Sequence, residues 1–160
     1  MSGTAPAERP AIRPARPADV AAICSLLKAY ADMGNLLPRT AADIEHNLDW
    51  FEVIDTGQGV AACGALEVFT DELGEIRSLV VSPDHQRRGL GRLMVEQLME
   101  RARRLGLGRV MALTYVPEFF HGLGFVTVPK DSLPEKVWGI CVNCYRFHNC
   151  DEIAVLKKLA

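Results

Sequence analysis

The chain has 160 residues, of which 49% are hydrophobic and 24% are charged, and its net charge is −2. This composition fits a globular domain with a hydrophobic core, and it excludes the strongly basic field typical of nucleic-acid binding. No apolar run is long enough to span a membrane, and the first ten residues lack the apolar segment of a signal peptide. We therefore expect a disordered lead over residues 1–10, one domain over residues 11–160, and a cytoplasmic protein.

The first third of the chain predicts a short strand followed by two helices. Residues 11–15 predict the strand, and Gly34 ends the first helix. The residues expected on the buried face of that helix are Val20, Ile23, Leu26, Leu27 and Tyr30. Thr40 and Asp43 have the spacing of a capping box and predict the start of a second helix.

The rest of the chain alternates strands and helices and predicts a mixed α/β sheet. The expected elements are strands at 51–55, 60–69 and 75–81, a helix at 89–105, a strand at 109–115, a short helix at 117–124, and strands at 125–128 and 152–159. We expect the strands at 51–55 and 60–69 to form a hairpin. The strand at 75–81 is apolar at its end, so we expect it to lie centrally in the sheet. The residues expected on the buried face of the long helix are Leu90, Leu93, Met94, Leu98 and Leu105.

The stretch QRRGLG, residues 86–91, follows an apolar strand and opens the long helix. The free N–H groups of a helix start attract an anion, and Gly89 and Gly91 let a phosphate approach the main chain closely. The side chains that add donors are Gln86, Arg87, Arg88 and Arg92. Alternatively, the glycines serve packing and the arginines are only solvated. The spacing matches neither the P-loop nor the Rossmann fingerprint.

In its order of elements and its loop motif, the chain from about Ile12 to the last strand resembles the GNAT superfamily of acyl-CoA N-acyltransferases. That family carries Q/R-x-x-G-x-G/A at this position, and FFHGLGF, residues 119–125, is similar to its second motif, F-Y-x-x-x-G-F. The resemblance implies a mostly antiparallel sheet flanked by helices, with acetyl-CoA as co-substrate and residues 86–92, including Leu90, around its pyrophosphate. It also implies that the strand before the loop splays from its neighbour, so that main-chain groups of Leu79 and Val81 pair with the pantetheine arm. The Leu79 N–H would then polarise the thioester carbonyl.

Acetyl transfer to an amine needs a neutral amine, so a base near the acceptor nitrogen is useful. Glu75 matches the position of the base glutamate in the GNAT enzymes that use one, and we favour that role. Alternatively, Glu75 is only a strand-edge charge paired with a neighbour such as Arg77, which alternation places on the same face of the strand. The tyrosine that often protonates the leaving thiolate is replaced by Phe120. Thr114 is the nearest substitute, and alternation points Tyr115 to the other face. A coenzyme A thiolate could also leave without an acid.

Several cations could bind an acidic acceptor, although each alone is more often a surface charge. These candidates are Arg39, Arg77, Lys136 and Arg146. The patterns LLPRT at 36–40 and LPEK at 133–136 resemble the acetyltransferase domain of N-acetylglutamate synthases, in their short stand-alone form. The resemblance implies that Arg39 and the main chain of Leu37 bind the α-carboxylate of L-glutamate or L-glutamine, at the first step of arginine biosynthesis. It also implies an acid role for the hydroxyl of Thr114.

The C-terminal segment contains a compact cysteine cluster that fits two interpretations. Its members are Cys141, Cys144, His148 and Cys150. Four such ligands could hold a structural zinc ion, but the spacing matches no zinc family closely. We favour reduced cysteines that pack a loop, and so predict no metal.

Two other functions fit the sequence less well. A GNAT enzyme acting on another small amine or a peptide N-terminus would want an acidic pocket, whereas the candidate residues are arginines. A non-catalytic acyl-CoA sensor would not need Glu75. By analogy with the family, we expect a homodimer formed through a sheet edge or through the strand at residues 152–156, with a small-molecule amino acid as the other partner.

Overall fold

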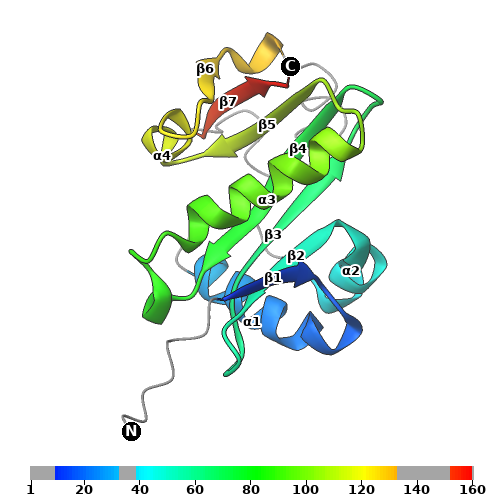
Figure 1. Ribbon diagram of the computed structural model, residues 1–160, viewed down its shortest axis with the longest axis vertical. Coiled ribbons are helices and arrows are strands. Elements are labelled where there is room, and N and C mark those ends of the chain that lie inside the picture. The colour runs from blue at the N-terminus through cyan, green and yellow to red at the C-terminus, as the bar shows by residue number, and fades with distance from the viewer. Residues whose placement is uncertain (1–9, 33–38, 133–151, 160) are drawn as a thin grey trace, which may run out of the picture. The chain divides into compact units, whose positions relative to one another are not determined.

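A computed structural model describes residues 10–32, 39–132 and 152–159 (Figure 1). Its strands are β1 (Ala11–Pro14), β2 (Phe51–Asp55), β3 (Val60–Val68), β4 (Leu73–Val81), β5 (Arg109–Thr114), β6 (Val126–Val128) and β7 (Ile153–Lys158). Its α-helices are α1 (Val20–Asp32), α2 (Ala41–His46), α3 (Leu90–Arg104) and α4 (Pro117–His121). The predicted order of strands and helices is confirmed, and β4 begins two residues earlier than expected. No helix in the described ranges is long and apolar enough to cross a membrane.

The seven strands form one sheet in the order β1-β2-β3-β4-β5-β7-β6. β4 and β5 run parallel, whereas β1–β2, β2–β3, β5–β7 and β6–β7 are antiparallel. β4 is the fourth strand of seven, which confirms its predicted central position. β7 lies between β5 and β6, so residues 152–156 are not at a sheet edge, and a homodimer formed through this C-terminal strand stays a prediction. A homodimer through β1 or β6, the two edge strands, stays a prediction.

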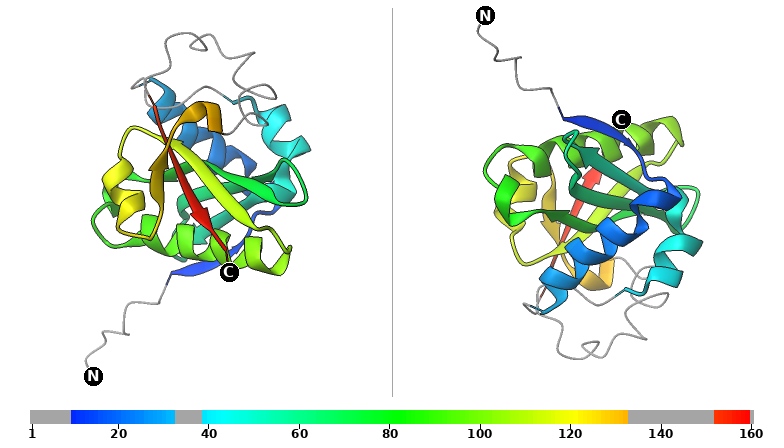
Figure 2. Two further views of the ribbon diagram at one scale, coloured as in Figure 1. Left: turned by 90° about the horizontal axis from the view of Figure 1, so that it is seen from above. Right: turned by 90° about the horizontal axis from the view of Figure 1, so that it is seen from below.

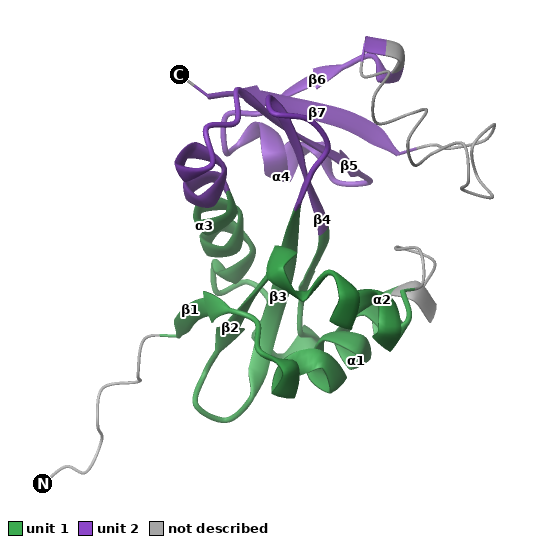
Figure 3. Cartoon of the chain, turned by 90° about the vertical axis from the view of Figure 1, so that its right-hand side faces the viewer, with its two compact units in different colours: residues 1–66, 78–98 green, residues 67–77, 99–160 purple. Residues whose placement is uncertain are grey.

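The chain divides into two compact units, coloured in Figure 3. Unit 1 comprises residues 1–66 and 78–98, and unit 2 comprises residues 67–77 and 99–160. The divisions fall within β3, β4 and α3, so each of these elements contributes residues to both units.

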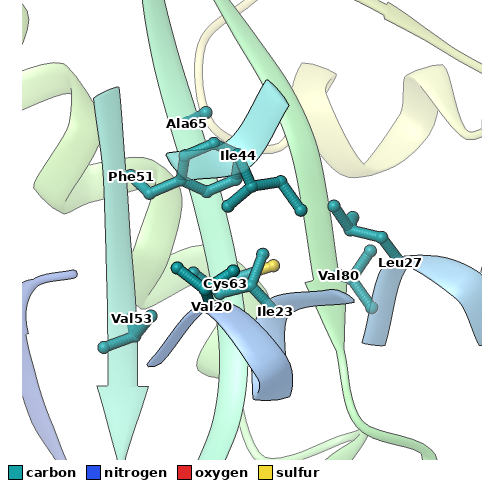
Figure 4. Packing of buried hydrophobic residues seen from close by; sticks show 9 residues of the cluster. All are labelled: Val20, Ile23, Leu27, Ile44, Phe51, Val53, Cys63, Ala65 and Val80. Atoms are coloured by element: carbon teal, nitrogen blue, oxygen red, sulfur yellow. The ribbon is translucent and has the colours of Figure 1, made fainter. Parts of the chain in front are cut away.

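Unit 1 packs helices α1 and α2 against one face of its strands (Figure 4). The core residues are Val20, Ile23 and Leu27 of α1, Ile44 of α2, Phe51 and Val53 of β2, Cys63 and Ala65 of β3, and Val80 of β4. Side chains alternate along a strand, so Gly64 faces the opposite side, toward α3. A Cβ on Gly64 would lie 2.9 Å from the Cγ of Met94, and glycine therefore permits α3 to pack closely on β3.

The capping residue predicted the start of α2 correctly, whereas helical periodicity predicted the buried face of α3 only partly. The hydroxyl of Thr40 accepts a hydrogen bond from the Asp43 N–H at 3.0 Å, which confirms the predicted cap of α2. In α3, the prediction was wrong for Leu93 and Leu105, which are 39% and 55% exposed. The observed buried residues of α3 are Leu90, Met94, Val95, Leu98, Met99 and Ala102. They form a stripe that Leu93 misses, and Leu105 follows the end of the helix.

Unit 2 contains strands β5, β7 and β6, which lie side by side in Figure 2. Every residue of β5 pairs with β7, from Arg109 opposite Lys158 to Thr114 opposite Ile153. The core residues of unit 2 are Leu73, Met111 and Ala154, with Leu113, Val128 and Leu156 packed against them. Phe120 of α4 makes edge-to-face contacts with Phe119 and Phe125, at centroid distances of 5.1 and 5.2 Å.

Candidate active site

The parallel pairing of β4 with β5 is short. It covers Leu73 to Glu75 on β4 and Arg109 to Met111 on β5, whereas β5 stays paired with β7 as far as Thr114. Both strands are described throughout, so the rest of β4 is not paired with β5. This agrees with the splayed strand that the sequence resemblance implied, in which main-chain groups of β4 become available to a ligand.

Ser78 interrupts the regular backbone of β4 just beyond this pairing. Its φ angle is +55°, in the left-handed region that residues other than glycine seldom adopt. Its hydroxyl accepts a hydrogen bond from Nη1 of Arg39 at 3.0 Å, and its carbonyl accepts one from the thiol of Cys63 at 3.4 Å. The role of Ser78 could not be predicted from the sequence, because a serine within a strand has no pattern of its own.

Arg39 is held rigidly by three groups of unit 1. Its Nε donates to Oδ2 of Asp43 at 2.6 Å, its Nη1 donates to Ser78, and its guanidinium lies 5.4 Å from the centroid of the Phe51 ring. The Arg39 side chain is only 10% exposed. A guanidinium has five N–H groups, and these contacts use two of them. The remaining N–H groups on Nη1 and Nη2 form a pre-oriented edge that suits a planar carboxylate.

The loop before α3 has the geometry of an anion cradle. The first hydrogen bond of the helix runs from the Leu93 N–H to the Gly89 carbonyl at 3.0 Å, so the amides of Leu90, Gly91 and Arg92 have no acceptor within the helix. Gly89 has a φ of +76°, and no atom lies within 4 Å of a Cβ built on it. The main chain is therefore open to close approach at the positive end of a fifteen-residue helix.

The side chains of the cradle differ in their surroundings. Gln86, Arg87 and Arg88 are exposed, and Arg87 has a left-handed φ of +66°. Leu90 is buried, so only its amide can face a ligand. Arg92 pairs along the helix surface with Glu96 at 2.8 Å. The structure thus fits a pyrophosphate mainly through the main chain, with Arg87 and Arg88 as added cations.

In unit 2, Glu75 and Arg77 lie on the same face of β4, as alternation predicted. Nε of Arg77 lies 3.5 Å from Oε1 of Glu75, and its Nη1 is 2.8 Å from Oε2 of Glu67. Glu75 is only 2% exposed. The sequence analysis missed Glu67, because its place beside Arg77 depends on the pairing of neighbouring strands. Arg77 therefore lies next to two carboxylates. This setting suits an ion-pair partner of Glu75 better than a residue that binds the substrate.

Thr114 ends β5 with its hydroxyl held in one orientation. Its Oγ1 accepts a hydrogen bond from the Val116 N–H at 2.9 Å, which directs the hydroxyl's own hydrogen elsewhere. Thr114 is buried, whereas Tyr115 is exposed, as alternation predicted. Phe120 lies in the aromatic cluster of α4 and has no proton to donate. Thr114 is thus placed better than Tyr115 to act as a donor.

Several predicted residues fall outside the described ranges. They are Leu37, Lys136 and Arg146 of the expected acceptor site, and Cys141, Cys144, His148 and Cys150 of the cysteine cluster. Within the described ranges, no group of histidine, cysteine and acidic side chains could hold a metal ion. Burial raises the pKa of the Cys63 thiol to about 12, so this cysteine stays neutral and is not a nucleophile.

Comparison with known proteins agrees with this geometry. The model of the Acetyltransferase (GNAT) family matches residues 22–125. An N-acetyltransferase of Chlorobaculum tepidum, described as uncharacterised, is 37% identical over 96% of this chain and 99% of its own length. The amino-acid acetyltransferase of Mycobacterium tuberculosis is 38% identical over 81% of this chain and 76% of its own length.

A solved structure extends the likeness to the whole fold. The N-acetylglutamate synthase of Neisseria gonorrhoeae, complexed with coenzyme A and N-acetyl-glutamate, matches with a TM-score of 0.86 and 28% identity. The match covers 95% of this chain and 35% of the synthase chain. The chain therefore belongs to the GNAT family and is an acetyl-CoA-dependent N-acetyltransferase.

Proposed function

We propose that the enzyme transfers the acetyl group of acetyl-CoA to the α-amino group of L-glutamate, or of L-glutamine. The product with glutamate is N-acetylglutamate, at the first step of arginine biosynthesis. The names of the relatives support an amino-acid acceptor. The amino-acid acetyltransferase of Neisseria meningitidis is 33% identical over 78% of this chain, which spans 29% of that protein's length. The coenzyme A and N-acetyl-glutamate of the Neisseria gonorrhoeae synthase support the same substrates.

The observation that carries the proposal is the setting of Arg39. A nearly buried guanidinium, fixed through Nε by Asp43 and through Nη1 by Ser78, presents a charged, planar edge. A bidentate bond to a carboxylate uses such an edge at little cost in side-chain entropy. A polyamine or another cation would instead be repelled by Arg39. Arg39 thus favours the α-carboxylate of an amino acid over a cationic acceptor.

The cradle is the proposed site for the donor. The pyrophosphate of acetyl-CoA would accept hydrogen bonds from the amides at the start of α3, with Arg87 and Arg88 neutralising its charge. Main-chain groups of Leu79 and Val81 on β4 would pair with the pantetheine arm. The Leu79 N–H would donate to the thioester oxygen, where negative charge develops in the transition state.

Glu75 is the proposed general base. The α-ammonium group of the acceptor loses one proton to the carboxylate of Glu75, directly or through a water molecule. The neutral nitrogen then attacks the thioester carbon, the tetrahedral intermediate loses a second proton from its nitrogen to solvent, and the carbon–sulfur bond breaks as the carbonyl re-forms. The position of Glu75 supports this role, because its carboxylate is almost fully buried and lies 3.5 Å from Arg77, which also pairs with Glu67.

Thr114 is the proposed donor to the leaving group. The hydroxyl of Thr114 would donate a hydrogen bond to the coenzyme A thiolate and pass its proton to the sulfur while it takes up another proton from solvent. The bond from the Val116 N–H to Oγ1 supports this role, because the oxygen acts there as an acceptor and the hydroxyl hydrogen is left to be donated to another group. A thiolate is a tolerable leaving group near neutral pH, so this contribution should be smaller than that of the base.

The test is turnover of acetyl-CoA with a panel of acceptors, measured by thiol release and by the mass of the product. The panel contains glutamate, glutamine, other amino acids, a polyamine and a peptide with a free N-terminus. We expect the highest kcat/KM with glutamate or glutamine. A preference for the polyamine or the peptide would show that glutamate is not the acceptor, and the enzyme would still be an acetyltransferase. Binding of acetyl-CoA without turnover of any acceptor would favour a sensor.

A further inference from the structure

A hydrogen-bonded triangle joins helix α1 to the first residue of the cradle. The hydroxyl of Tyr30 donates to the carbonyl oxygen of Val81 at 3.1 Å. Nε2 of Gln86 donates to the same carbonyl at 3.3 Å and also to the hydroxyl oxygen of Tyr30. The three groups come from α1, from the end of β4 and from the turn that leads into α3. None of the proposed chemical steps uses Tyr30.

The position of the Tyr30 hydroxyl is set by the core of unit 1. Its ring packs against the hydrophobic cluster that contains Ile23, Leu27 and Val80. Gln86, in contrast, is an exposed side chain with several rotatable bonds, and it would lose considerable rotamer entropy on being held in one place. A phenol fixed by the core therefore gives this mobile side chain a defined partner.

The loop beyond Gln86 needs such a support. Arg87 and Gly89 both have left-handed φ angles, and an arginine adopts this conformation only where its surroundings impose it. The turn contributes one local hydrogen bond, from the His85 N–H to the Ser82 carbonyl at 2.9 Å. Gln86 is the residue next to Arg87, so a fixed Gln86 side chain restrains the loop where its backbone enters the left-handed conformation.

We propose that Tyr30 is a positioning residue for the cofactor loop. It holds Gln86 against the end of β4, so that the amides of Leu90, Gly91 and Arg92 and the backbone of Arg87 are arranged before acetyl-CoA binds. The inference rests on the proposed use of the cradle for the pyrophosphate. The Val81 carbonyl is part of the same device, because it accepts hydrogen bonds from both Tyr30 and Gln86.

The test is the affinity of the full-length protein for acetyl-CoA, measured by calorimetry on Tyr30→Phe. The ring stays packed, so the fold and melting temperature should hold, and loss of the hydroxyl should weaken binding by about three- to tenfold. The kcat at saturating acetyl-CoA should stay within about twofold. Thr56→Val is the matched control, since it removes a hydroxyl that also donates to a carbonyl in unit 1, at 3.3 Å, outside the cradle. It should leave the affinity unchanged.

A double-mutant cycle separates positioning from direct contact. If Tyr30 acts through Gln86, then Tyr30→Phe should cost less than about twofold in a Gln86→Ala background. Full additivity of the two losses would show that Tyr30 acts independently of Gln86, and would overturn the proposal. An unchanged affinity in Tyr30→Phe would overturn it as well.

Hydrogen exchange of the protein alone distinguishes this inference from the proposed cofactor site. Amides of residues 87–92 should exchange faster in Tyr30→Phe, and also in Gln86→Ala, which alters only an exposed side chain. Unchanged exchange in both variants would refute the positioning role even if wild type binds acetyl-CoA. A different outcome is also informative: exchange is faster in Tyr30→Phe, but variants of the cradle bind acetyl-CoA normally. This outcome would refute the cofactor site and would still support the restraint of the loop by Tyr30.

Discussion

The two units hold functional groups of different kinds. Unit 1 presents main-chain amides at the start of α3 and a guanidinium, Arg39, both suited to anions. Unit 2 contains a buried carboxylate, Glu75, and a buried hydroxyl, Thr114. The proposed binding groups and the proposed proton-transfer groups are therefore separated along the chain, with β4 contributing residues to both units.

This difference predicts which kinetic constant should change when residues of each unit are substituted. Groups that contact a ligand equally in the ground and transition states change affinity or KM, whereas groups that act only in the transition state change kcat. Variants of unit 1 should thus appear mainly in binding, and variants of unit 2 mainly in turnover.

The largest effect is expected for Glu75→Gln. The amide cannot accept the proton of the acceptor amine, so kcat should fall by about 10²–10⁴-fold while acetyl-CoA affinity is unchanged. Steady-state kinetics over a range of pH, together with calorimetry, provide the measurement. Glu118→Gln, an exposed glutamate of the same unit, should behave as wild type. A loss below threefold at every pH would make Glu75 a structural partner of Arg77.

Gly89→Val should weaken acetyl-CoA binding by tenfold or more, because a β-branched side chain blocks the approach of the pyrophosphate to the main chain. Gly59→Val is the matched control. Both glycines have positive φ angles and open space where a Cβ would lie, so both variants should lose about 1–2 kcal/mol of stability. Calorimetry should show weaker binding for Gly89→Val alone. Equal affinities would place the anion elsewhere.

Thr114→Val should lower kcat by about three- to thirtyfold and leave acetyl-CoA affinity unchanged, because it removes the proposed donor to the thiolate. The Val116 N–H also loses its acceptor, so the melting temperature is measured in parallel. The loss in kcat should grow with acyl donors whose thiols are more basic. Thr127→Val, an exposed threonine of the same unit, serves as the control. A normal kcat would mean that the thiolate leaves unaided.

The smallest functional effect is expected for Asp19→Asn, which should change stability only. Oδ2 and Oδ1 of Asp19 accept hydrogen bonds from Arg13 at 2.7 and 3.0 Å, and this pair lowers the pKa of Asp19. Its contribution, about 1–2 kcal/mol, should be complete above pH 4 and disappear as the pH falls through the lowered pKa. Urea unfolding at pH 7 and below pH 3 should show the gap closing. A constant gap would refute the ionic origin.

The glycine-containing turn and the start of α3 were predicted well, because both are local features of the sequence. Glu75 and Arg77 on one face followed from strand alternation in the same way. Ser78, Asp43 and Glu67 could not be assigned their contacts, because these depend on how separate segments pack. The exposure of Leu93 shows the same limit, since helical periodicity locates a stripe only approximately.

The central claim is that Arg39 binds the α-carboxylate of the acceptor. The most direct measurement compares kcat/KM for glutamate and for its α-amide, with wild type and Arg39→Ala. Loss of a charge-assisted bond costs about 2–5 kcal/mol, so wild type should prefer glutamate by more than tenfold, and Arg39→Ala should show no preference. Acetyl-CoA affinity should not change, and Arg103→Ala, an exposed arginine, should keep the wild-type preference. An unchanged preference in Arg39→Ala would contradict the account.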